Sequence, residues 1–429
     1  MVRFLHAADL HIDSPLSACD QAAPRMAARL RAATRTALDN LVTLAVDEQV
    51  EFVVIAGDLF DRDRDDFNTA RWLTAKFAEL GAAGIRVYLV RGNHDAMAKI
   101  SKVLTWPANV YEFKTTADTA PAFHEGVRLH GRSYKTGAVE DPEFARSYPA
   151  PVANCINIGV LHTCASDSGG KVGGHEPYAP CNVGELAAKG YDYWALGHVH
   201  TRAILHPQPC IAFPGNPQGR HINEPDAHGC LLVTLAPPDR AVCEFRALDD
   251  VRWAKVNVDV SGCRTLGGAV DAAVAEVAQH ALRADGRLLA VRLTLEGTTP
   301  AHADLVASKP QLLEELRGRF QTSLEDQVHL ERAVLATRQA TQQVRALGTL
   351  RAYATGADRH AESAALEDAA LIAAKERVQA AQNKVKAVVA DGAVEFPDLD
   401  EAAGRKVLLA AARGWIDHEV AATAGEVAP

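Results

Sequence analysis

Short apolar runs alternate with longer amphipathic stretches along the chain up to about residue 245. Runs rich in Val, Ile, Leu and aromatic residues are typical of strands that are buried on both faces. They are VRFLHA (2–7), EFVVIAG (51–57), IRVYLVRG (85–92), INIGVLH (156–162), YWALGH (193–198) and GCLLVTLA (229–236). Residues 25–46 and 68–80 place apolar side chains at helical spacing between the first three runs. The pattern predicts an α/β domain.

A second pattern begins near residue 250. WAKVNVDV (253–260) alternates apolar with polar residues, and RLLAVRLTLEG (287–297) forms a second predicted strand. Helical spacing follows each of them, at about 266–281 and 303–320. This β-α-β-α string predicts a small separate α/β domain.

The character changes again past about residue 340. The sequence there is rich in Ala, Gln and charged residues with helical periodicity, but it has few large apolar side chains. Such helices are unable to form a good core alone, so we expect them to dock on the protein's own body or on a partner. We therefore predict three regions, at 1–248, 249–340 and 341–429.

Composition narrows the functional classes. With 48% hydrophobic and 23% charged residues, the 429-residue chain is typical of a soluble protein with ordinary cores. The net charge of -9 excludes a global basic field, so a polyanionic substrate must be held locally by metal ions or clustered arginines. Eight scattered cysteines without a CxxC pair fit reduced thiols, and no signal-like apolar stretch opens the chain. We expect a cytoplasmic protein.

Polar side chains follow directly after five of the predicted strands. They are Asp9, His11, Asp58, Asp61, Asn93, His94, Asp95, His162, His198 and His200. Ligands in open α/β sheets bind beyond the carboxyl ends of the strands, where loops converge. One such residue alone is more often a helix cap or a surface residue. Their joint occurrence indicates a single polar site.

The residue types indicate metal chemistry. Four histidines, two aspartates and an asparagine form an oxygen and nitrogen donor set, which suits divalent Mn, Fe, Zn or Mg rather than a structural zinc cage. These seven residues are Asp9, His11, Asp58, Asn93, His162, His198 and His200. Seven ligands exceed the needs of one ion with open positions. Two ions bridged by a carboxylate use them naturally, and such a pair can orient a hydroxide and neutralise phosphate oxygens.

The blocks DLH (9–11), GDLFD (57–61), GNHD (92–95), His162 and GHVH (197–200) resemble the five signature blocks of the calcineurin-like metallophosphoesterases. The resemblance covers about residues 1–235. FLHAADLHIDSPL and FPGNPQGRHINE narrow it to the bacterial DNA repair exonuclease branch, which is SbcD/YhaO-like. It implies an α/β fold of two packed β-sheets flanked by helices, with a small α/β cap domain and a helical C-terminal tail.

The resemblance also implies a role for each site residue. Asp9, His11 and His200 would hold one metal, Asn93, His162 and His198 would hold the other, and Asp58 would bridge them. His94 would protonate the leaving oxygen, and Asp61 would orient His94 as its catalytic partner. An imidazole suits this task because it titrates near neutral pH.

Candidate substrate contacts are less specific. Arg62, Asn216, Gln218 and Arg220 are the residues that we expect to face the substrate. For Arg62 a solvated loop charge is the alternative, and for the other three it is a purely structural turn. The cluster Arg25, Arg29, Arg31 and Arg35 could follow a phosphate backbone. A solvated helix face is the favoured interpretation of that cluster.

The leading hypothesis is a Mn²⁺-dependent DNA nuclease with two divalent ions per chain, acting as a 3'-5' exonuclease or also as an endonuclease in DNA repair. The resemblance implies that residues 249–340 present DNA to the site. It also implies that residues 341–429 dock on an SMC-like coiled-coil ATPase, with a second copy of the chain as a further candidate partner. Two alternatives stay open. One is a bimetal enzyme for a phosphoprotein, cyclic nucleotide or nucleotide-sugar phosphoester, and the other is a non-catalytic binding scaffold.

Overall fold

The computed structural model describes residues 1–16, 24–61, 67–98, 104–141, 143–166, 176–236, 240–324 and 327–339. Two predictions lie outside these residues: the substrate contact at Arg62 and the helical docking region at 341–429. No helix in the described part of the chain is both long and apolar enough to cross a membrane.

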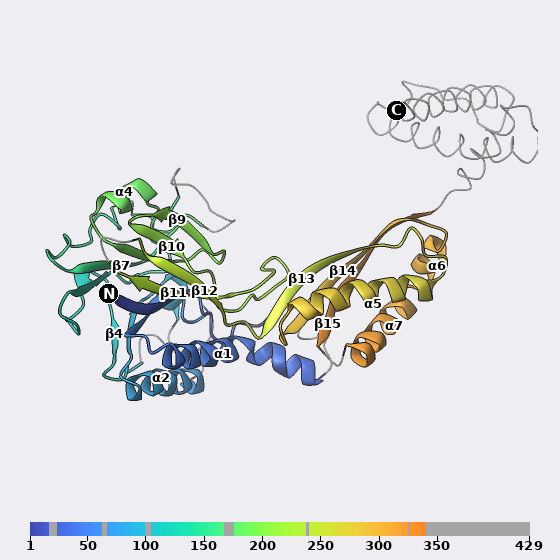
Figure 1. The fold of residues 1–429 in the computed structure, drawn as a ribbon, viewed down its shortest axis with the longest axis horizontal. Coiled ribbons are helices and arrows are strands. Elements are labelled where there is room, and N and C mark those ends of the chain that lie inside the picture. Colours follow the sequence, from blue (N-terminus) through green and yellow to red (C-terminus); the bar gives the residue numbers. More distant parts are fainter. Residues whose placement is uncertain are drawn as a thin grey trace, which may run out of the picture. The chain divides into compact units, whose positions relative to one another are not determined.

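The first sheet has six strands in the order β12-β11-β1-β2-β3-β4 (Figure 1). Their bounds are β1 (Val2–Ala7), β2 (Phe52–Ala56), β3 (Arg86–Val90), β4 (Val110–Glu112), β11 (Gly229–Leu235) and β12 (Val242–Ala247). Strands β1 to β4 are parallel, while β11 pairs antiparallel with both β1 and β12. The central strand β2 is buried along its whole length, as its apolar run predicted.

The second sheet also has six strands, in the order β5-β6-β7-β8-β10-β9. Their bounds are β5 (Asp118–Thr119), β6 (Val127–Gly131), β7 (Ile156–His162), β8 (Tyr193–Gly197), β9 (Ala203–Pro207) and β10 (Cys210–Phe213). Strands β6, β7, β8 and β10 are parallel, and the two edge strands are antiparallel to their neighbours. Both sheets therefore have a parallel centre, so the carboxyl ends of their central strands can carry one site.

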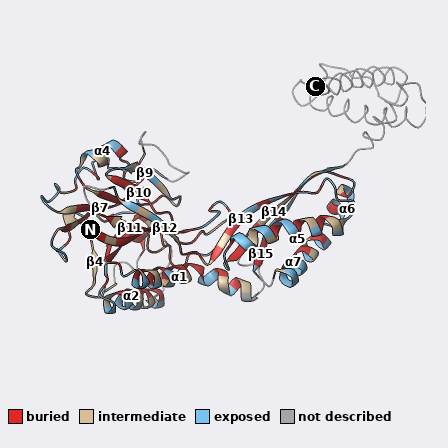
Figure 2. Ribbon diagram, viewed as in Figure 1, coloured by how far each residue is buried: buried red, intermediate tan, exposed pale blue. Residues whose placement is uncertain are grey.

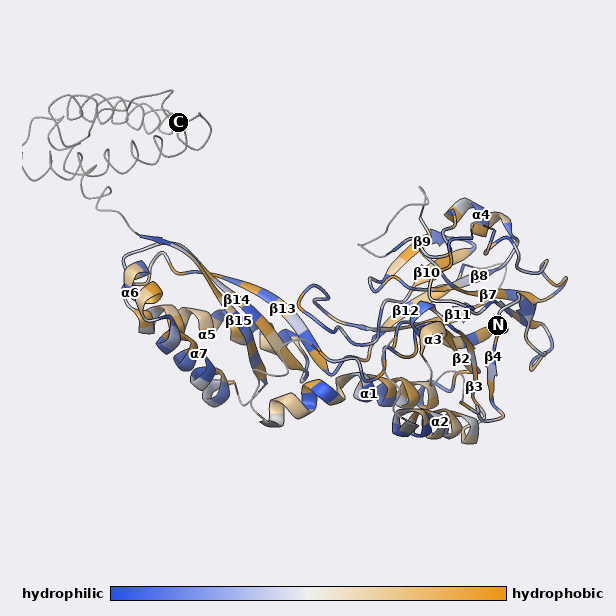
Figure 3. Cartoon of the chain, turned by 180° about the vertical axis from the view of Figure 1, so that it is seen from behind, coloured by the Kyte–Doolittle hydropathy of each residue, from blue (hydrophilic) through white to orange (hydrophobic). Residues whose placement is uncertain are grey.

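The two sheets pack face to face and helices cover their outer faces. The core between them includes Phe4, which stacks on Phe52 with ring centroids 4.8 Å apart, and Tyr193 from the second sheet. Helices α1 (Pro24–Asp47) and α2 (Phe67–Ala82) cover the first sheet, and α4 (Val183–Ala188) packs on the second. Figures 2 and 3 show these strands as buried and largely apolar. The two-sheet α/β fold that the resemblance implied is confirmed.

A third, three-stranded sheet follows in the sequence. Strands β13 (Val251–Asp259), β14 (Leu288–Thr299) and β15 (Val328–Gln339) are parallel. Helices α5 (Leu266–Arg283), α6 (His302–Ala307) and α7 (Lys309–Ser323) share a core with one face of this sheet. The β-α-β-α pattern predicted β13, α5 and β14, and a single helix at about 303–320 where the structure has α6 and α7. It did not predict β15. The range 249–340 includes the whole sheet, and its status as a separate domain stays a prediction.

Buried polar contacts join the third sheet to the loop that follows β10. The Gln218 amide donates to the carbonyl of Val251 at 2.6 Å, and its oxygen accepts from the Val251 amide at 3.1 Å. The Trp253 indole donates to the carbonyl of Gly219 at 2.8 Å. Arg29 of α1 forms an ion pair with Asp250 at 2.8 Å. Arg29 therefore fixes the start of β13. Its partner is Asp250 of the protein, not the phosphate backbone that was considered for the arginine cluster.

A buried histidine in β1 makes the fold sensitive to acid. His6 Nε2 donates to the carbonyl of Leu196 at 3.0 Å, and Nδ1 lies 2.9 Å from the Tyr193 hydroxyl. Burial lowers the pKa of His6 to about 3, against the smaller opposing effect of the Leu196 hydrogen bond. Because the unfolded chain binds this proton near pH 6.5 and the folded chain does not, stability is lost as the pH falls from 6.5 towards 3.

We therefore expect wild type to lose about 1.4 kcal/mol of unfolding free energy per pH unit below 6 through His6 alone. His6→Asn lacks this titration, so the stability difference between wild type and the variant should shrink as the pH falls. Urea unfolding of both proteins between pH 5 and 7.5 measures that difference. A difference that stays constant over this range would contradict the assignment.

Candidate metal centre

The predicted ligands lie at the carboxyl ends of five parallel strands from both sheets. Asp9 and His11 follow β1, and Asp58 follows β2, with left-handed φ values of 55°, 43° and 52°. His198 follows β8 and has a φ of 104°. Left-handed backbone is uncommon for such residues and costs free energy, so the surrounding structure must hold it in place. Hydrogen bonds from the amides of Asp9 and His11 to the carbonyls of Gly57 and Asp58 do so.

Two glycines allow these loops to approach each other closely. A Cβ on Gly57, which has a φ of 96°, would lie 2.3 Å from the His162 ring. A Cβ on Gly92 would lie 2.3 Å from Oδ1 of Asp58. Both glycines flank predicted ligands in the sequence. Their lack of a side chain therefore makes the convergence of the ligands sterically possible.

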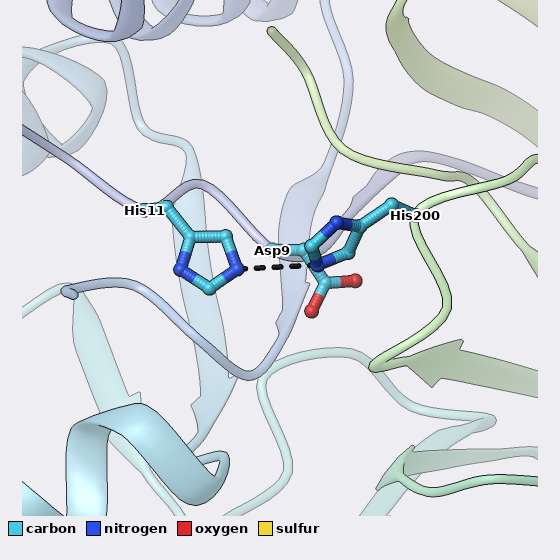
Figure 4. Close-up of side chains that lie close together, drawn as sticks. All are labelled: Asp9, His11 and His200. Atoms are coloured by element: carbon cyan, nitrogen blue, oxygen red, sulfur yellow. Dashed lines mark hydrogen bonds between the residues drawn. The ribbon is translucent and has the colours of Figure 1, made fainter. Parts of the chain in front are cut away.

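Asp9, His11 and His200 form the first group of ligands (Figure 4). The Nε2 atoms of His11 and His200 face each other at 3.3 Å. The Asp9 carboxylate lies beside them and accepts the backbone N–H of His198 at 2.9 and 3.1 Å. Nitrogen and oxygen donors that converge in this way are suited to share one cation.

Asp58, His162 and His198 form a second group, which Asn93 joins. His162 Nε2 lies 3.0 Å from Oδ1 of Asn93 and 3.5 Å from Oδ2 of Asp58. The same Oδ2 atom lies 3.9 Å from Nε2 of His11, a residue of the first group. Asp58 therefore lies between the two groups, where a bridging carboxylate is required.

In three of the histidines, one ring nitrogen contacts a protein oxygen that orients the ring. His162 Nδ1 donates to the carbonyl of Ala56 at 2.9 Å, and His198 Nε2 donates to that of Glu176 at 2.8 Å. His200 Nδ1 lies 2.7 Å from Oε1 of Glu224. Such partners set the tautomer and the orientation of metal-binding imidazoles. The opposite nitrogen of His162 and that of His200 both point into the groups of ligands described above.

The ionisation of the site fits divalent cations. Burial raises the pKa of Asp58 to about 6, and burial together with the nearby Asp58 carboxyl raises that of Asp9 well above its ordinary value. Burial and the neighbouring charge of Arg220 lower the pKa of His11, which favours the neutral imidazole that binds metals. Two buried carboxyl groups beside the His11 imidazole are stabilised by a bound cation. The residues therefore fit a dinuclear divalent-metal site.

His94 lies beside both groups and is oriented by Asp61. Its Nδ1 atom donates to Oδ1 of Asp61 at 2.8 Å, and its Nε2 atom lies 4.0 Å from Oδ2 of Asp58. The side chain is 20% exposed, so it can reach a substrate. This is the arrangement that general acid catalysis by His94 needs.

A cavity of about 430 Å³ opens over the two groups of ligands. Arg220 lines it, as predicted for a substrate contact, together with His221 of the same predicted loop and with Thr201 and Asn223. Asn216 and Gln218 do not line it. They are 1% and 2% exposed, and each donates its amide group to the backbone of its own loop. The structure thus places these two residues in supporting positions rather than against a substrate.

Two carboxylates make supporting contacts that were not predicted, although Asp95 was among the polar residues at the predicted strand ends. Glu224 contacts His200 and also accepts the backbone N–H of Arg220 at 2.7 Å. Asp95 accepts the backbone N–H groups of Phe60 and Gly92, at 2.9 and 3.0 Å, and so ties α3 (Asn93–Met97) to the loop after β2. A metal-binding histidine usually has such an oxygen partner, but no spacing rule tells which carboxylate of the chain supplies it.

Burial raises the pKa of Glu224, but the hydrogen bond and charge of His200 and the charge of Arg220 outweigh it and leave the pKa well below its ordinary value. Glu224 is thus a carboxylate that holds His200. We expect Glu224→Ala to weaken Mn²⁺ binding at the Asp9–His11–His200 group by about 10- to 100-fold. Calorimetric titration with Mn²⁺ measures it. Unchanged affinity at both sites would show that the contact is not needed for metal binding.

Comparison with known proteins adds independent information. A model of the calcineurin-like phosphoesterase family matches residues 2–202, and a model of the middle domain of metallophosphoesterase YhaO matches residues 253–338. The uncharacterized metallophosphoesterase YhaO of Bacillus subtilis is 35% identical over 302 residues, which are 69% of this chain and 72% of that protein.

Two more distant proteins also match. The DNA double-strand break repair protein Mre11 of Methanopyrus kandleri is 27% identical over 295 residues, which are 61% of this chain and 60% of that protein. A crystal structure of a dimetal phosphatase from Danio rerio covers 58% of this chain and 96% of its own, with 13% identity and a TM-score of 0.35.

Proposed function

This chain belongs to the calcineurin-like phosphoesterase family and is a metal-dependent phosphoesterase hydrolase, and from that premise we propose that it is a Mn²⁺-dependent DNA nuclease. The observation that carries the proposal is the position of Asp58, whose Oδ2 atom lies within 4.0 Å of ring nitrogens of His11, His94 and His162. One carboxylate thus touches both groups of ligands and the candidate acid.

The chemistry follows from these positions. When bound, two divalent cations neutralise phosphate oxygens and supply a nucleophile near neutral pH. His94, held by Asp61, delivers a proton to the leaving oxygen of the scissile ester, because Asp61 holds its Nδ1 atom and so directs its Nε2 atom to the cavity wall beside Asp58. Arg220, whose side chain is 17% exposed in the cavity, offers its guanidinium to the phosphate. Oxygen and imidazole donors without thiolates suit Mn²⁺ among the divalent ions.

DNA as the substrate has two lines of support. The Mre11 relative is named for DNA double-strand break repair. In addition, Lys255, Arg292 and Arg332 lie in register across the third sheet, on the face opposite the core that its helices share. Arg292 is paired with Glu331. Exposed Lys255 contacts Asn223 of the cavity wall at 3.3 Å, so this face continues to the site.

The proposal includes the direction of digestion and a partner. We propose 3'-5' exonuclease activity, with endonuclease activity as a second mode, and a role in DNA repair. An SMC-like coiled-coil ATPase docked on residues 341–429 would supply the basic surface that a chain of net charge -9 lacks. A pull-down of such an ATPase by the full chain, compared with a chain that ends at residue 339, tests the partner.

One assay separates the candidate functions. Wild type and His94→Ala are incubated with Mn²⁺ and either linear duplex DNA labelled at one end, closed circular DNA, or bis-p-nitrophenyl phosphate. The proposal is supported if wild type digests linear DNA from the 3' end and His94→Ala does not. Cutting of the circle reveals endonuclease activity. Turnover of the small diester with intact DNA would favour a phosphoesterase for another substrate. Inertness towards all three, with metals bound, would favour a binding scaffold.

A further inference from the structure

Ser14 lies in the loop after β1, three residues beyond His11, and its hydroxyl contacts the predicted catalytic pair. Its Oγ atom donates to Oδ2 of Asp61 at 2.9 Å. The residue is only 5% exposed, and a buried hydroxyl that makes a hydrogen bond is costly to misplace. Ser14 does not line the cavity, so it has no direct access to a substrate.

The two oxygens of Asp61 serve different neighbours. Oδ2 accepts from Ser14 at 2.9 Å, while Oδ1 accepts from Nδ1 of His94 at 2.8 Å. A carboxylate held by one oxygen can rotate and change its partner, but one that is held at both oxygens has a fixed plane. Ser14, Asp61 and His94 therefore form a line of hydrogen bonds that ends at the ring nitrogen facing Asp58.

The loop that carries Ser14 is itself held rigidly. The Ser14 amide donates to the His11 carbonyl at 2.9 Å, and Ile12 pairs with Phe60 of the loop that contains Asp61. Asp13 accepts two hydrogen bonds from the Arg35 guanidinium, at 2.6 and 2.7 Å. The bidentate pair anchors this loop to α1. The position of the Ser14 hydroxyl is thus set before any substrate binds.

We propose that Ser14 is a positioning residue for the general acid. It holds the plane of Asp61 so that His94 donates its Nδ1–H to Asp61 and directs the N–H at Nε2, whose proton is transferred, towards the leaving oxygen. The inference rests on the proposed role of His94. A positioning role of Ser14 differs from a merely structural role in one measurable respect. A mispositioned acid slows departure of a poor leaving group more than departure of a good one, whereas a distorted site slows both equally.

The test uses two diesters that differ only in the leaving group, methyl p-nitrophenyl phosphate and methyl phenyl phosphate. We expect Ser14→Ala to lower kcat with the poorer phenolate leaving group by about tenfold and with p-nitrophenolate by about twofold or less. Ser14→Thr, which keeps the hydroxyl, should restore both rates. Thr299→Val, which removes a buried hydroxyl from the third sheet, is the matched control and should leave the ratio unchanged.

The outcomes distinguish the two claims. Equal losses on both diesters with Ser14→Ala, or no loss at all, would overturn the role of Ser14. If His94→Ala also lacks a leaving-group preference, the proposed role of His94 fails as well. Nitrogen NMR of labelled histidines in the Mg²⁺-loaded protein, with His94 assigned from His94→Ala, gives a readout that is independent of turnover. In spectra recorded at a pH where the His94 ring is neutral, we expect the Nδ1–H tautomer in wild type and a mixture of tautomers in Ser14→Ala. An unchanged spectrum contradicts the inference.

Discussion

Asp58→Ala should bind neither metal ion tightly and should lose phosphodiesterase activity by about 10³-fold or more, because charge stabilisation of the reacting phosphate is lost with the ions. Asp58 is 2% exposed, and its Oδ2 atom lies 3.5 Å from His162 and 3.9 Å from His11. Removal of this one carboxylate takes a ligand from both groups at once. Mass-spectrometric counting of Mn²⁺ per chain after dialysis, beside turnover of bis-p-nitrophenyl phosphate, measures both effects.

The substitution also removes the acceptor of the His94 backbone N–H, at 2.9 Å, so folding must be checked by thermal unfolding. Asp118→Ala is the matched control. Asp118 accepts a hydrogen bond from the Tyr111 hydroxyl at 2.9 Å and lies outside the cavity. It should keep both ions and full activity. If Asp58→Ala folds, retains two ions and turns over at the wild-type rate, the bridging role is wrong.

His94→Ala should lower turnover by about 10²- to 10⁴-fold while both ions stay bound, because it removes a general acid and no ligand. One ligand atom each of His94, His11 and Asp58 lies within 4.8 Å of the other two, so the metal count of the variant decides between an acid and a ligand. Nδ1 of His94 is engaged by Asp61 at 2.8 Å, while Nε2 lies 4.0 Å from Asp58 at the cavity wall. Measurement of kcat and KM with bis-p-nitrophenyl phosphate, beside metal counts for the same samples, gives the result. The loss should fall mainly on kcat.

His221→Ala provides the comparison for this prediction. His221 lines the same cavity, but its side chain is 43% exposed and its nearest carboxylate is that of Glu224, at 3.7 Å. We expect only a small effect on kcat. If the two variants lose activity equally, or if His94→Ala loses metal, then His94 is not acting as a separate acid.

The sequence predicts much of the central fold because buried parallel strands are continuous apolar runs. The runs at 2–7 and 156–162 coincide with β1 and β7, and the helical spacing at 25–46 corresponds to α1 (Pro24–Asp47). Strand β15 was missed. Its sequence, VHLERAVLATRQ, contains good helix formers, and an irregular register near Arg292 breaks the alternation that marks a half-buried strand.

The convergence of the site was predictable, but its supporting contacts were not. Strand ends locate Asp58 and His162, since the topology of parallel sheets fixes where they must lie. The contacts of Glu224 and Ser14 depend on how loops from different strands meet, which no periodicity encodes. The prediction for Gln218 differs from the structure for the same reason: a polar loop near a site can face either the substrate or the protein. Here its amide holds the start of β13.

The most direct test of a dinuclear centre is anomalous diffraction from crystals grown with Mn²⁺. A centre bridged by Asp58 predicts two manganese peaks per chain, roughly 3.5–4 Å apart. Asp58 should lie between them, with Asp9, His11 and His200 around one peak and Asn93, His162 and His198 around the other. A single peak, or two peaks that do not share Asp58, would contradict it.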